Sequence, residues 1–205
     1  MSTALVITSS ALGETSVSNQ LVQDAVTGLR AQDPSLRIVT RDLGSAPIPH
    51  ITMDAAAALR GAEPANAAQA EAQALSNQLI AELQAADIVV IGAPMYNFGI
   101  SSTLKTWFDY VLRAGVTFRY SESGPEGLLK GKRAIVIESR GGLYSEGPAQ
   151  AMDSQEPHLR TLLGFIGITD VTFVRAERLA FGPEAREQAI GAARRVIQSE
   201  FLRAA

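Results

Sequence analysis

The sequence predicts an α/β protein with a doubly wound parallel sheet of five strands and helices on both of its faces. Short apolar runs rich in β-branched residues alternate with longer amphipathic helical patterns, which is the order expected for βαβ units. The chain has 205 residues, of which 46% are hydrophobic and 19% charged. This size and balance predict one globular domain spanning residues 1–205, because no linker, repeat or low-complexity tract divides the chain.

Five segments have the length and composition of strands. The continuous apolar run DIVVIG is typical of a buried central strand, whereas the alternating run RIVTRDL is typical of an edge strand. The expected strands are residues 4–7, 37–43, 87–92, 133–138 and 171–174. Ligands of such sheets bind beyond the carboxyl ends of the strands, so the loops after the first, third and fourth strands are the expected site.

Helical patterns occupy most of the intervals between these strands. The expected helices begin near Ser18, at Ala67, after Ser101 or Ser102, at His158 and at Pro183. Residues 44–66 contain three prolines and are expected to form a long loop with at most a short helix. The glycine-rich residues 114–132 are expected to be irregular.

Residue types that perform much side-chain catalysis are scarce in this chain. There is no cysteine, which excludes disulfides, thiolate nucleophiles, cysteine-ligated zinc and iron–sulfur clusters. The two histidines, His50 and His158, cannot form a three-histidine metal centre, and we expect no metal. Each is expected to be a surface or capping residue. If the protein is an enzyme, a bound cofactor is therefore the expected source of its reactivity.

The net charge and the first residues exclude further classes of protein. A net charge of −3 provides no basic field for nucleic acid or for an anionic membrane. The apolar run at residues 4–7 ends at Thr8, which is too short for a signal peptide or a membrane span. We expect a cytoplasmic protein that binds neither nucleic acid nor membranes.

The loop after the first expected strand carries five hydroxyl side chains and leads directly into a helix. Hydroxyl groups, free backbone N–H groups and the positive end of the helix dipole together favour a phosphate. The alternative is that these residues only cap the helix. The sequence lacks G-x-G-x-x-G, the P-loop motif and the G-x-S-x-G nucleophile motif, so a mononucleotide with one phosphate monoester remains. The five hydroxyl residues are Ser9, Ser10, Thr15, Ser16 and Ser18.

The other two loops have the composition of a slot for a planar ring. Met95, Tyr96, Asn97 and Phe98 follow the third strand and suit a flat aromatic ligand with a polar edge, although these aromatic residues could instead pack over the end of the sheet. After the fourth strand, paired glycines at 141 and 142 allow close approach of the backbone, although an ordinary turn is the alternative. A phosphate pocket beside a ring slot is the geometry that flavin mononucleotide (FMN) requires.

Five separated segments, in this order along nearly the whole chain, resemble the FMN-dependent NADH-azoreductases of bacteria. These enzymes are a branch of the flavodoxin-like NAD(P)H quinone reductases. The matching segments are 16–21 (SVSNQL), 93–98 (APMYNF), 113–120 (RAGVTFRY) with 124–128 (GPEGL), 139–142 (SRGG) and 163–168 (LGFIGI). Thr15 replaces an aromatic residue, and Tyr144 stands where some relatives have histidine.

The resemblance implies non-covalent FMN in a homodimer with the flavin at the subunit interface. It implies three groups of cofactor-binding residues: Ser10, Ser16, Val17 and Ser18 around the phosphate, Met95, Tyr96, Asn97 and Phe98 along the isoalloxazine, and Ser139, Arg140, Gly141 and Gly142 at its far edge. It also implies that Phe98, Tyr120 and Phe165 wall the substrate pocket.

The implied activity is ping-pong transfer of hydride from NADH through FMN to a quinone or an aromatic azo compound. The resemblance implies no catalytic side chain, because the chemistry belongs to the flavin. Lys105 and Arg140 could attract the phosphates of NADH, or could be solvated surface charges. Two alternatives are a flavodoxin-type electron carrier without NADH-dependent reductase activity and a flavodoxin-like scaffold without flavin.

Overall fold

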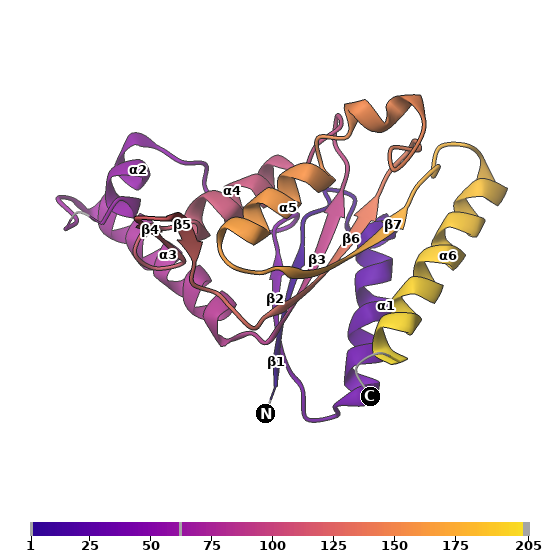
Figure 1. The fold of residues 1–205 in the computed structure, drawn as a ribbon. Coiled ribbons are helices and arrows are strands. Elements are labelled where there is room, and N and C mark those ends of the chain that lie inside the picture. Colours follow the sequence, from indigo (N-terminus) through magenta and orange to yellow (C-terminus); the bar gives the residue numbers. More distant parts are fainter. Residues whose placement is uncertain (1, 62, 203–205) are drawn as a thin grey trace.

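The centre of the fold is a five-stranded parallel sheet (Figure 1). The computed structural model describes residues 2–61 and 63–202, except for the side chains of residues 201 and 202. The sheet has the strand order β2-β1-β3-β6-β7. Its strands are β1 (Thr3–Thr8), β2 (Arg37–Asp42), β3 (Ile88–Pro94), β6 (Arg133–Ser139) and β7 (Asp170–Ala176). The predicted sheet is confirmed, with β3 in the middle and β2 at one edge.

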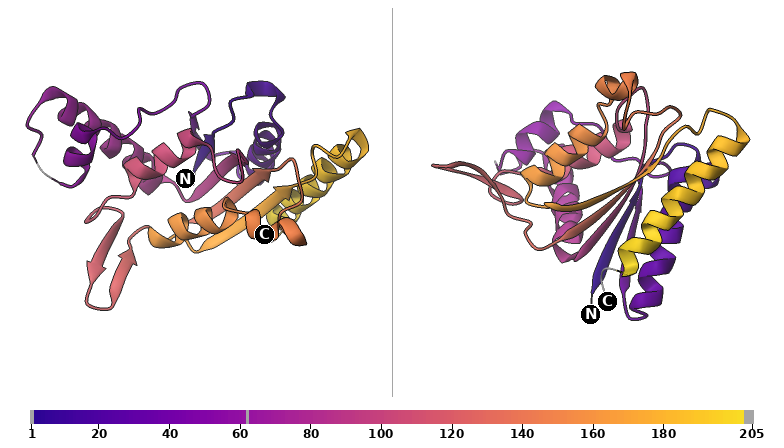
Figure 2. Two further views of the ribbon diagram at one scale, coloured as in Figure 1. Left: turned by 90° about the horizontal axis from the view of Figure 1, so that it is seen from above. Right: turned by 45° about the vertical axis from the view of Figure 1, so that its right-hand side comes forward.

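Helices cover both faces of the sheet, as the two views of Figure 2 show. On one face α1 (Val17–Gln32) packs against α6 (Pro183–Leu202). The other face is covered by α3 (Ala67–Ala85), α4 (Ser102–Val111) and α5 (Glu156–Phe165). The expected long loop at 44–66 contains the short helix α2 (Met53–Leu59), which packs on α3. In the part of the chain that the structure describes, no helix combines the length and apolarity needed to cross a membrane.

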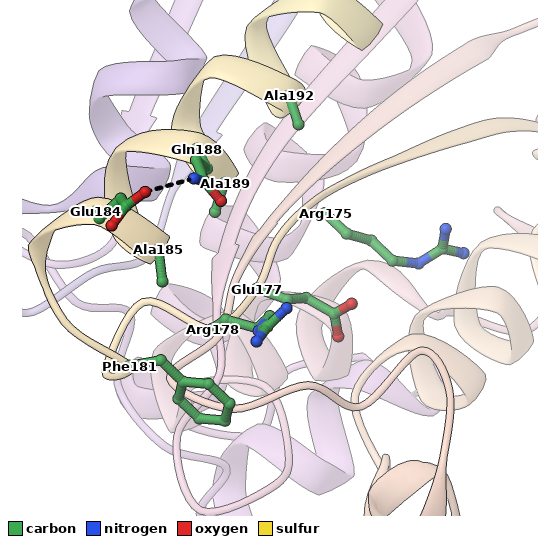
Figure 3. A pocket seen from close by; sticks show the side chains of 9 residues that line it. All are labelled: Arg175, Glu177, Arg178, Phe181, Glu184, Ala185, Gln188, Ala189 and Ala192. Carbon is green, nitrogen blue, oxygen red and sulfur yellow. Dashed lines mark hydrogen bonds between the residues drawn. The ribbon is translucent and has the colours of Figure 1, made fainter.

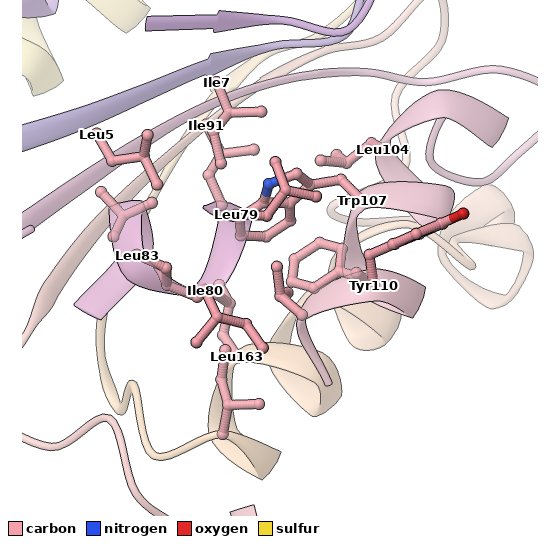
Figure 4. Close-up of a cluster of buried hydrophobic side chains, with 14 of the residues drawn as sticks. Leu5, Ile7, Leu79, Ile80, Leu83, Ile91, Leu104, Trp107, Tyr110 and Leu163 are labelled. Atoms are coloured by element: carbon pink, nitrogen blue, oxygen red, sulfur yellow. The ribbon is translucent and has the colours of Figure 1, made fainter. Parts of the chain in front are cut away.

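Two apolar cores lie on opposite faces of the sheet, because successive side chains of a strand alternate between its faces. Ala4 and Val6 of β1 belong to the core under α1, whereas Leu5 and Ile7 belong to the core under α3 and α4. Figure 4 shows this second core, in which Trp107 of α4 meets aliphatic side chains of the sheet and of α3. Burial of both faces explains why β1, β3 and β6 are continuously apolar in sequence.

One prediction about the fold is wrong. Residues 114–132 are not wholly irregular, because β4 (Phe118–Ser121) and β5 (Gly124–Gly127) form an antiparallel hairpin. The sequence of β5 is GPEG, whose residues have low strand propensity, so its pairing partner rather than its composition makes it a strand. In Figure 2 this hairpin projects from the helix-covered body.

Serine side chains cap α1 and α4 close to the expected places, whereas α5 begins at Glu156, two residues before the expected His158, without a side-chain cap. Ser16 precedes α1 and its side chain accepts a hydrogen bond from the N–H of Asn19. Of the two expected caps of α4, Ser101 is the one that accepts from the N–H of Leu104, at 3.2 Å. These caps begin the helices that follow the loops after β1 and β3.

Candidate functional site

The carboxyl edge of the sheet brings the three expected ligand loops together. The N–H of Met95, after β3, donates to the carbonyl of Ser139 at the end of β6, at 2.9 Å. The N–H of Ala11, after β1, donates to the hydroxyl of Tyr96 at 3.0 Å. The loops after β1, β3 and β6 therefore form one continuous surface, as the order of strands requires.

The loop after β1 presents buried hydroxyl groups at the N-terminus of α1. Ser10, Ser16 and Ser18 are all buried, and the hydroxyls of Ser16 and Ser18 lie 3.0 Å apart. The first turn of a helix leaves backbone N–H groups without intrahelical partners, and its dipole favours an anion. Capping explains Ser16 but not the buried hydroxyl of Ser18, which lies inside the helix. This donor set fits a phosphate monoester.

The loop after β3 is a tight turn with an unusual backbone. Tyr96 and Gly99 exchange two backbone hydrogen bonds, of 2.9 and 3.1 Å, across Asn97 and Phe98. Both central residues have positive φ angles, 47° for Asn97 and 72° for Phe98. Asparagine tolerates this conformation, whereas it costs a bulky residue about 1–2 kcal/mol. The side chains of Tyr96 and Phe98 are 37% and 40% exposed, so the turn presents aromatic surface outward.

The loop after β6 has an open cradle at its first glycine. The carbonyls of Gly141 and Gly142 accept hydrogen bonds from the N–H groups of Ala180 and Arg178, which hold the loop in place. A Cβ atom built at Gly141 would meet nothing closer than the Cβ of Ala180, at 3.7 Å. The space beside this glycine is therefore available to a ligand that approaches the backbone closely, as a flavin edge would.

Arg140 occupies a different environment from the expected solvated cation. Its side chain is fully buried and pairs with Glu138 at 2.7 Å and with Asp153 and Glu177 at 3.1 Å each. The carboxylates draw the guanidinium inward, so only the backbone of Arg140 is available to a ligand at the surface. Lys105 is also engaged, because it pairs with Asp109 one turn later on α4.

Two carboxyl groups beside Arg140 have strongly shifted pKa values. Burial raises the pKa of Glu138 from 4.5 to about 8, against the opposing attraction of Arg140. Burial acts in the same direction on Glu156, but hydrogen bonds from Arg175 and Arg160 outweigh it and lower the pKa of that carboxyl to about 2. Burial thus favours the protonated form of Glu138, whereas the hydrogen bonds from two arginines favour the ionised form of Glu156.

The residues expected to wall the substrate pocket fall into two groups. Phe98 makes an edge-on contact with Tyr144, with ring centroids 6.1 Å apart. Phe118 contacts Tyr120 at 5.6 Å and Phe165 at 4.5 Å, at the base of the β4–β5 hairpin. The ring contacts of the described residues thus do not join Tyr120 and Phe165 to Phe98.

The two histidines take different places in the fold. The Nδ1 atom of His50 is 3.1 Å from the hydroxyl of Thr106, and the His50 side chain is exposed. His158 lies within α5, where burial lowers its pKa, rather than just before the helix as expected. Among the described residues, no group of three histidine, aspartate or glutamate side chains is placed to hold a metal.

Two hollows differ in their relation to the expected site. A cavity of about 380 Å³ lies beside the turn after β3 and is lined by Ser9, Tyr96, Asn97 and the start of α4. Figure 3 shows another, of about 470 Å³, between the end of β7 and α6. It contains none of the expected cofactor residues, and the guanidinium of Arg178 lies 5.3 Å from the ring of Phe181 at its edge.

Three polar residues at the edge were not predicted from the sequence. The buried Oδ1 atom of Asn19 has no hydrogen-bond partner among the described residues, and it offers an acceptor that the hydroxyls of a ribityl chain could satisfy. Gln155 and Glu177 both bond to Arg140. For Asn19 the adjacent serine run was an available signal, whereas no local pattern marks the other two.

A doubly wound parallel sheet whose carboxyl-edge loops fit a phosphate and a planar ring is the architecture of a flavodoxin-like protein. The family model described as "Flavodoxin-like fold" matches residues 2–201. The FMN-dependent NADH:quinone oxidoreductase of Hyphomonas neptunium is 57% identical over 194 residues, covering 95% of this chain and 93% of that protein. The enzyme of the same name from Escherichia coli O157:H7 is 52% identical over 200 residues, covering 97% and 98%. The chain belongs to this family of quinone oxidoreductases.

Solved structures of azoreductases are similar to this chain over nearly its whole length. An azoreductase from Bacillus anthracis str. Sterne has a TM-score of 0.90 at 28% identity, covering 98% of this chain and 99% of that chain. An FMN-dependent NADH-azoreductase from Bacillus anthracis str. Ames Ancestor, solved in complex with FMN, has a TM-score of 0.90 at 25% identity and covers both chains fully. The resemblance stated from sequence is therefore confirmed.

Proposed function

We propose that the protein is an FMN-dependent NADH:quinone oxidoreductase that also reduces aromatic azo compounds. The observation that carries the proposal is that three features lie together at the carboxyl edge of the sheet. They are the buried hydroxyl groups at the N-terminus of α1, the exposed aromatic turn after β3 and the open space beside Gly141. The names of the relatives support the same activity. When bound, FMN supplies the hydride chemistry, which accounts for the absence of cysteine.

The chain's own residues bind and orient the cofactor in this proposal. The phosphate is held at the positive end of α1 by the hydroxyls of Ser10, Ser16 and Ser18 and by the backbone N–H of Val17. The turn at Met95–Phe98 lies along the ring. Backbone N–H groups at Gly141 and Gly142 face the far edge of the ring, where they favour negative charge. Preorganised backbone donors do this without a titrating side chain.

The active form is a homodimer in which two subunits complete each substrate pocket. Aromatic side chains at two separate places support this: Phe98 on the turn after β3, and Tyr120 with Phe118 and Phe165 at the projecting hairpin. Tyr120 is 74% exposed on the projecting hairpin, which is large for an aromatic side chain. NADH and the acceptor bind in turn against the same face. We place this single-domain enzyme in the cytoplasm.

Anaerobic addition of NADH to the FMN-loaded protein tests the reaction. We expect the visible flavin absorbance to bleach and then to return when a quinone or an azo dye is added. A flavodoxin-type carrier would keep its colour with NADH alone, and a scaffold without flavin would stay colourless in the presence of FMN. Either result overturns the proposal.

A hybrid of two variants, each weakened by the loss of one aromatic wall, tests the shared pocket. If Phe98 and Tyr120 come from different subunits, a heterodimer of a Phe98→Ala chain with a Tyr120→Ala chain contains one intact pocket and one doubly altered pocket. We expect the hybrid to regain about half of the wild-type activity with a wild-type KM, by this geometry. If both side chains come from one subunit, no pocket is intact and the hybrid keeps the raised KM of its parent variants. Each homodimeric variant is the control.

A further inference from the structure

The buried guanidinium of Arg140 connects the segments that surround the expected flavin ring. Its Nε donates to the side-chain oxygen of Gln155 at 2.9 Å, and its Nη2 donates to Glu138 at 2.7 Å. Its Nη1 donates to Glu177 at 3.1 Å. All three partners come from different parts of the chain, and neither Arg140 nor Glu138 has an exposed side chain.

Through Gln155, Arg140 is linked to the turn after β3. The side-chain amide of Gln155 donates to the carbonyl of Ala93 at 2.7 Å, just before the aromatic turn. The neighbouring Ser154 donates its backbone N–H to the carbonyl of Phe98 at 2.9 Å. Both ends of the residue 93–98 loop are therefore held by the segment that Arg140 binds.

Through Glu177, Arg140 is linked to the loop after β6. The Oε1 atom of Glu177 accepts the backbone N–H groups of Tyr144 and Ser145, at 2.8 and 3.0 Å. The backbone of Arg140 itself accepts from Leu179 and donates to Ala176. One planar cation thus fixes the loop of Gly141 and Gly142 relative to the aromatic turn.

Carboxyl groups from four positions in the chain surround Arg140 and hold it in this place. Glu138 on β6, Asp153 and Glu156 at the start of α5, and Glu177 after β7 surround it, with Arg175 as a second cation on β7. A lysine would keep the charge but could not present a rigid fork of five donors to separate acceptors. The arrangement therefore uses the shape of the guanidinium as well as its charge.

We propose that Arg140 is a positioning residue for the flavin, acting through Gln155 and Glu177 to hold the two ring-facing loops in one relative geometry. It does not touch the cofactor through its side chain. This inference rests on the FMN binding proposed above and goes beyond it, because it assigns the control of ring placement to a buried cluster. Such control is measured by comparing the affinities of the protein for oxidised and for reduced FMN.

The first experiment compares Arg140→Lys with the wild type by titrating apo-protein with FMN and measuring the two-electron potential of the bound flavin. We expect the FMN dissociation constant to rise at least tenfold. A tenfold change in the ratio of the affinities for oxidised and reduced flavin would shift the potential by about 30 mV. Arg41→Lys is the matched control, because Arg41 forms a bidentate pair with Glu82 away from the ring loops.

A second variant separates positioning from folding. Gln155→Met keeps a similar volume and leaves the Arg140 side chain unaltered, but removes the hydrogen bonds that join Arg140 to Gln155 and Gln155 to Ala93. We expect it to weaken FMN binding and shift the potential in the same direction as Arg140→Lys. The double variant should be little worse than either single variant, because both interrupt one path. All titrations are made well below the unfolding temperature of each apo-protein, so global unfolding does not contribute.

The outcomes distinguish this inference from the proposed function. If the wild type does not bind FMN, both are overturned. If the wild type binds FMN and Gln155→Met keeps its affinity and potential, the inference alone is overturned, whether or not Arg140→Lys folds. It is also overturned if Arg41→Lys changes FMN binding as much as Arg140→Lys, or if the two site variants act additively.

Discussion

Phe98 combines a strained backbone conformation with an exposed aromatic side chain. Its φ of 72° lies in the left-handed region, which favours glycine, yet its ring stands 40% exposed at the ligand edge. Such strain persists only where the surroundings hold it, and here the two hydrogen bonds between Tyr96 and Gly99 close the turn. The strain and the exposure fit the contact with a flat ligand that we propose for this side chain.

Replacing Phe98 by glycine separates these two roles. We expect Phe98→Gly to keep the free energy of unfolding or raise it by up to about 1 kcal/mol, because the positive φ no longer has a steric cost. The KM for a quinone should rise severalfold, because one aromatic wall is lost. Phe98→Tyr keeps both the ring and the strain and should leave KM near the wild-type value. A large loss of stability in the glycine variant would contradict this assignment.

Gly141 allows a test at a position where the fold has room for an added Cβ atom. Its added Cβ meets nothing closer than the Cβ of Ala180, at 3.7 Å, so Gly141→Ala should change the unfolding midpoint little. We expect Gly141→Val to weaken FMN binding and slow flavin reduction by NADH about tenfold or more, because the branched side chain fills the cradle. A normal stopped-flow rate of reduction would show that the flavin edge lies elsewhere.

At the scale of elements, the β4–β5 hairpin depends on contact between two glycines. A Cβ at Gly127 would lie 2.1 Å from the backbone nitrogen of Gly167, which follows α5. The N–H of Leu129 also donates to the carbonyl of Ile166, at 2.8 Å. The hairpin that carries Tyr120 is thus anchored to α5 by close backbone packing.

Gly127→Ala should separate the hairpin from α5. Backbone atoms cannot move aside as a flexible side chain would, so we expect a loss of about 1–3 kcal/mol in the free energy of unfolding. Gly164→Ala is the matched control within α5, since nothing lies within 4 Å of its added Cβ. It should be neutral or stabilising by up to about 1 kcal/mol. Equal denaturation midpoints for the two variants would disprove the close packing.

For the whole molecule, the buried charges make stability depend on pH in two opposite ways. Glu138 has a folded pKa of about 8 and an ordinary value of 4.5, so the folded protein binds more protons between these values. Stability falls as pH rises through that window. Glu156, with a folded pKa of about 2, binds fewer protons when folded, so stability falls as pH drops below 4.5.

Glu138→Gln should remove the first of these dependences. Urea unfolding of the wild type should show a decline on the order of a few kcal/mol between pH 5 and pH 8, by linkage. The variant should decline much less over this range, because glutamine does not titrate. The other charged groups facing Glu138, which are Arg140, Asp153, Glu156 and Arg175, are unchanged. Parallel curves for the two proteins would refute the assignment.

Local patterns in the sequence determined the order of strands and helices, the buried central strand and the hydroxyl-rich loop. The spacing of hydrophobic residues and the continuous apolar runs encode these features over a few residues. Because the strands are parallel, the loops that follow them lie at one edge of the sheet. Arg140 shows where such reasoning ends. Its sequence neighbours resemble those of a surface cation, and only residues 15 and 37 positions away, Gln155 and Glu177, bury it.

The hairpin and the turn at Phe98 were likewise decided by tertiary structure. β5 has the composition of a loop, and it becomes a strand because β4 pairs with it and α5 supports it. The left-handed backbone of Phe98 has no sequence motif, since local sterics oppose it and the closure of the turn imposes it. Short-range preferences therefore specified the elements, whereas long-range pairing of charges and backbone groups decided how the ligand edge is built.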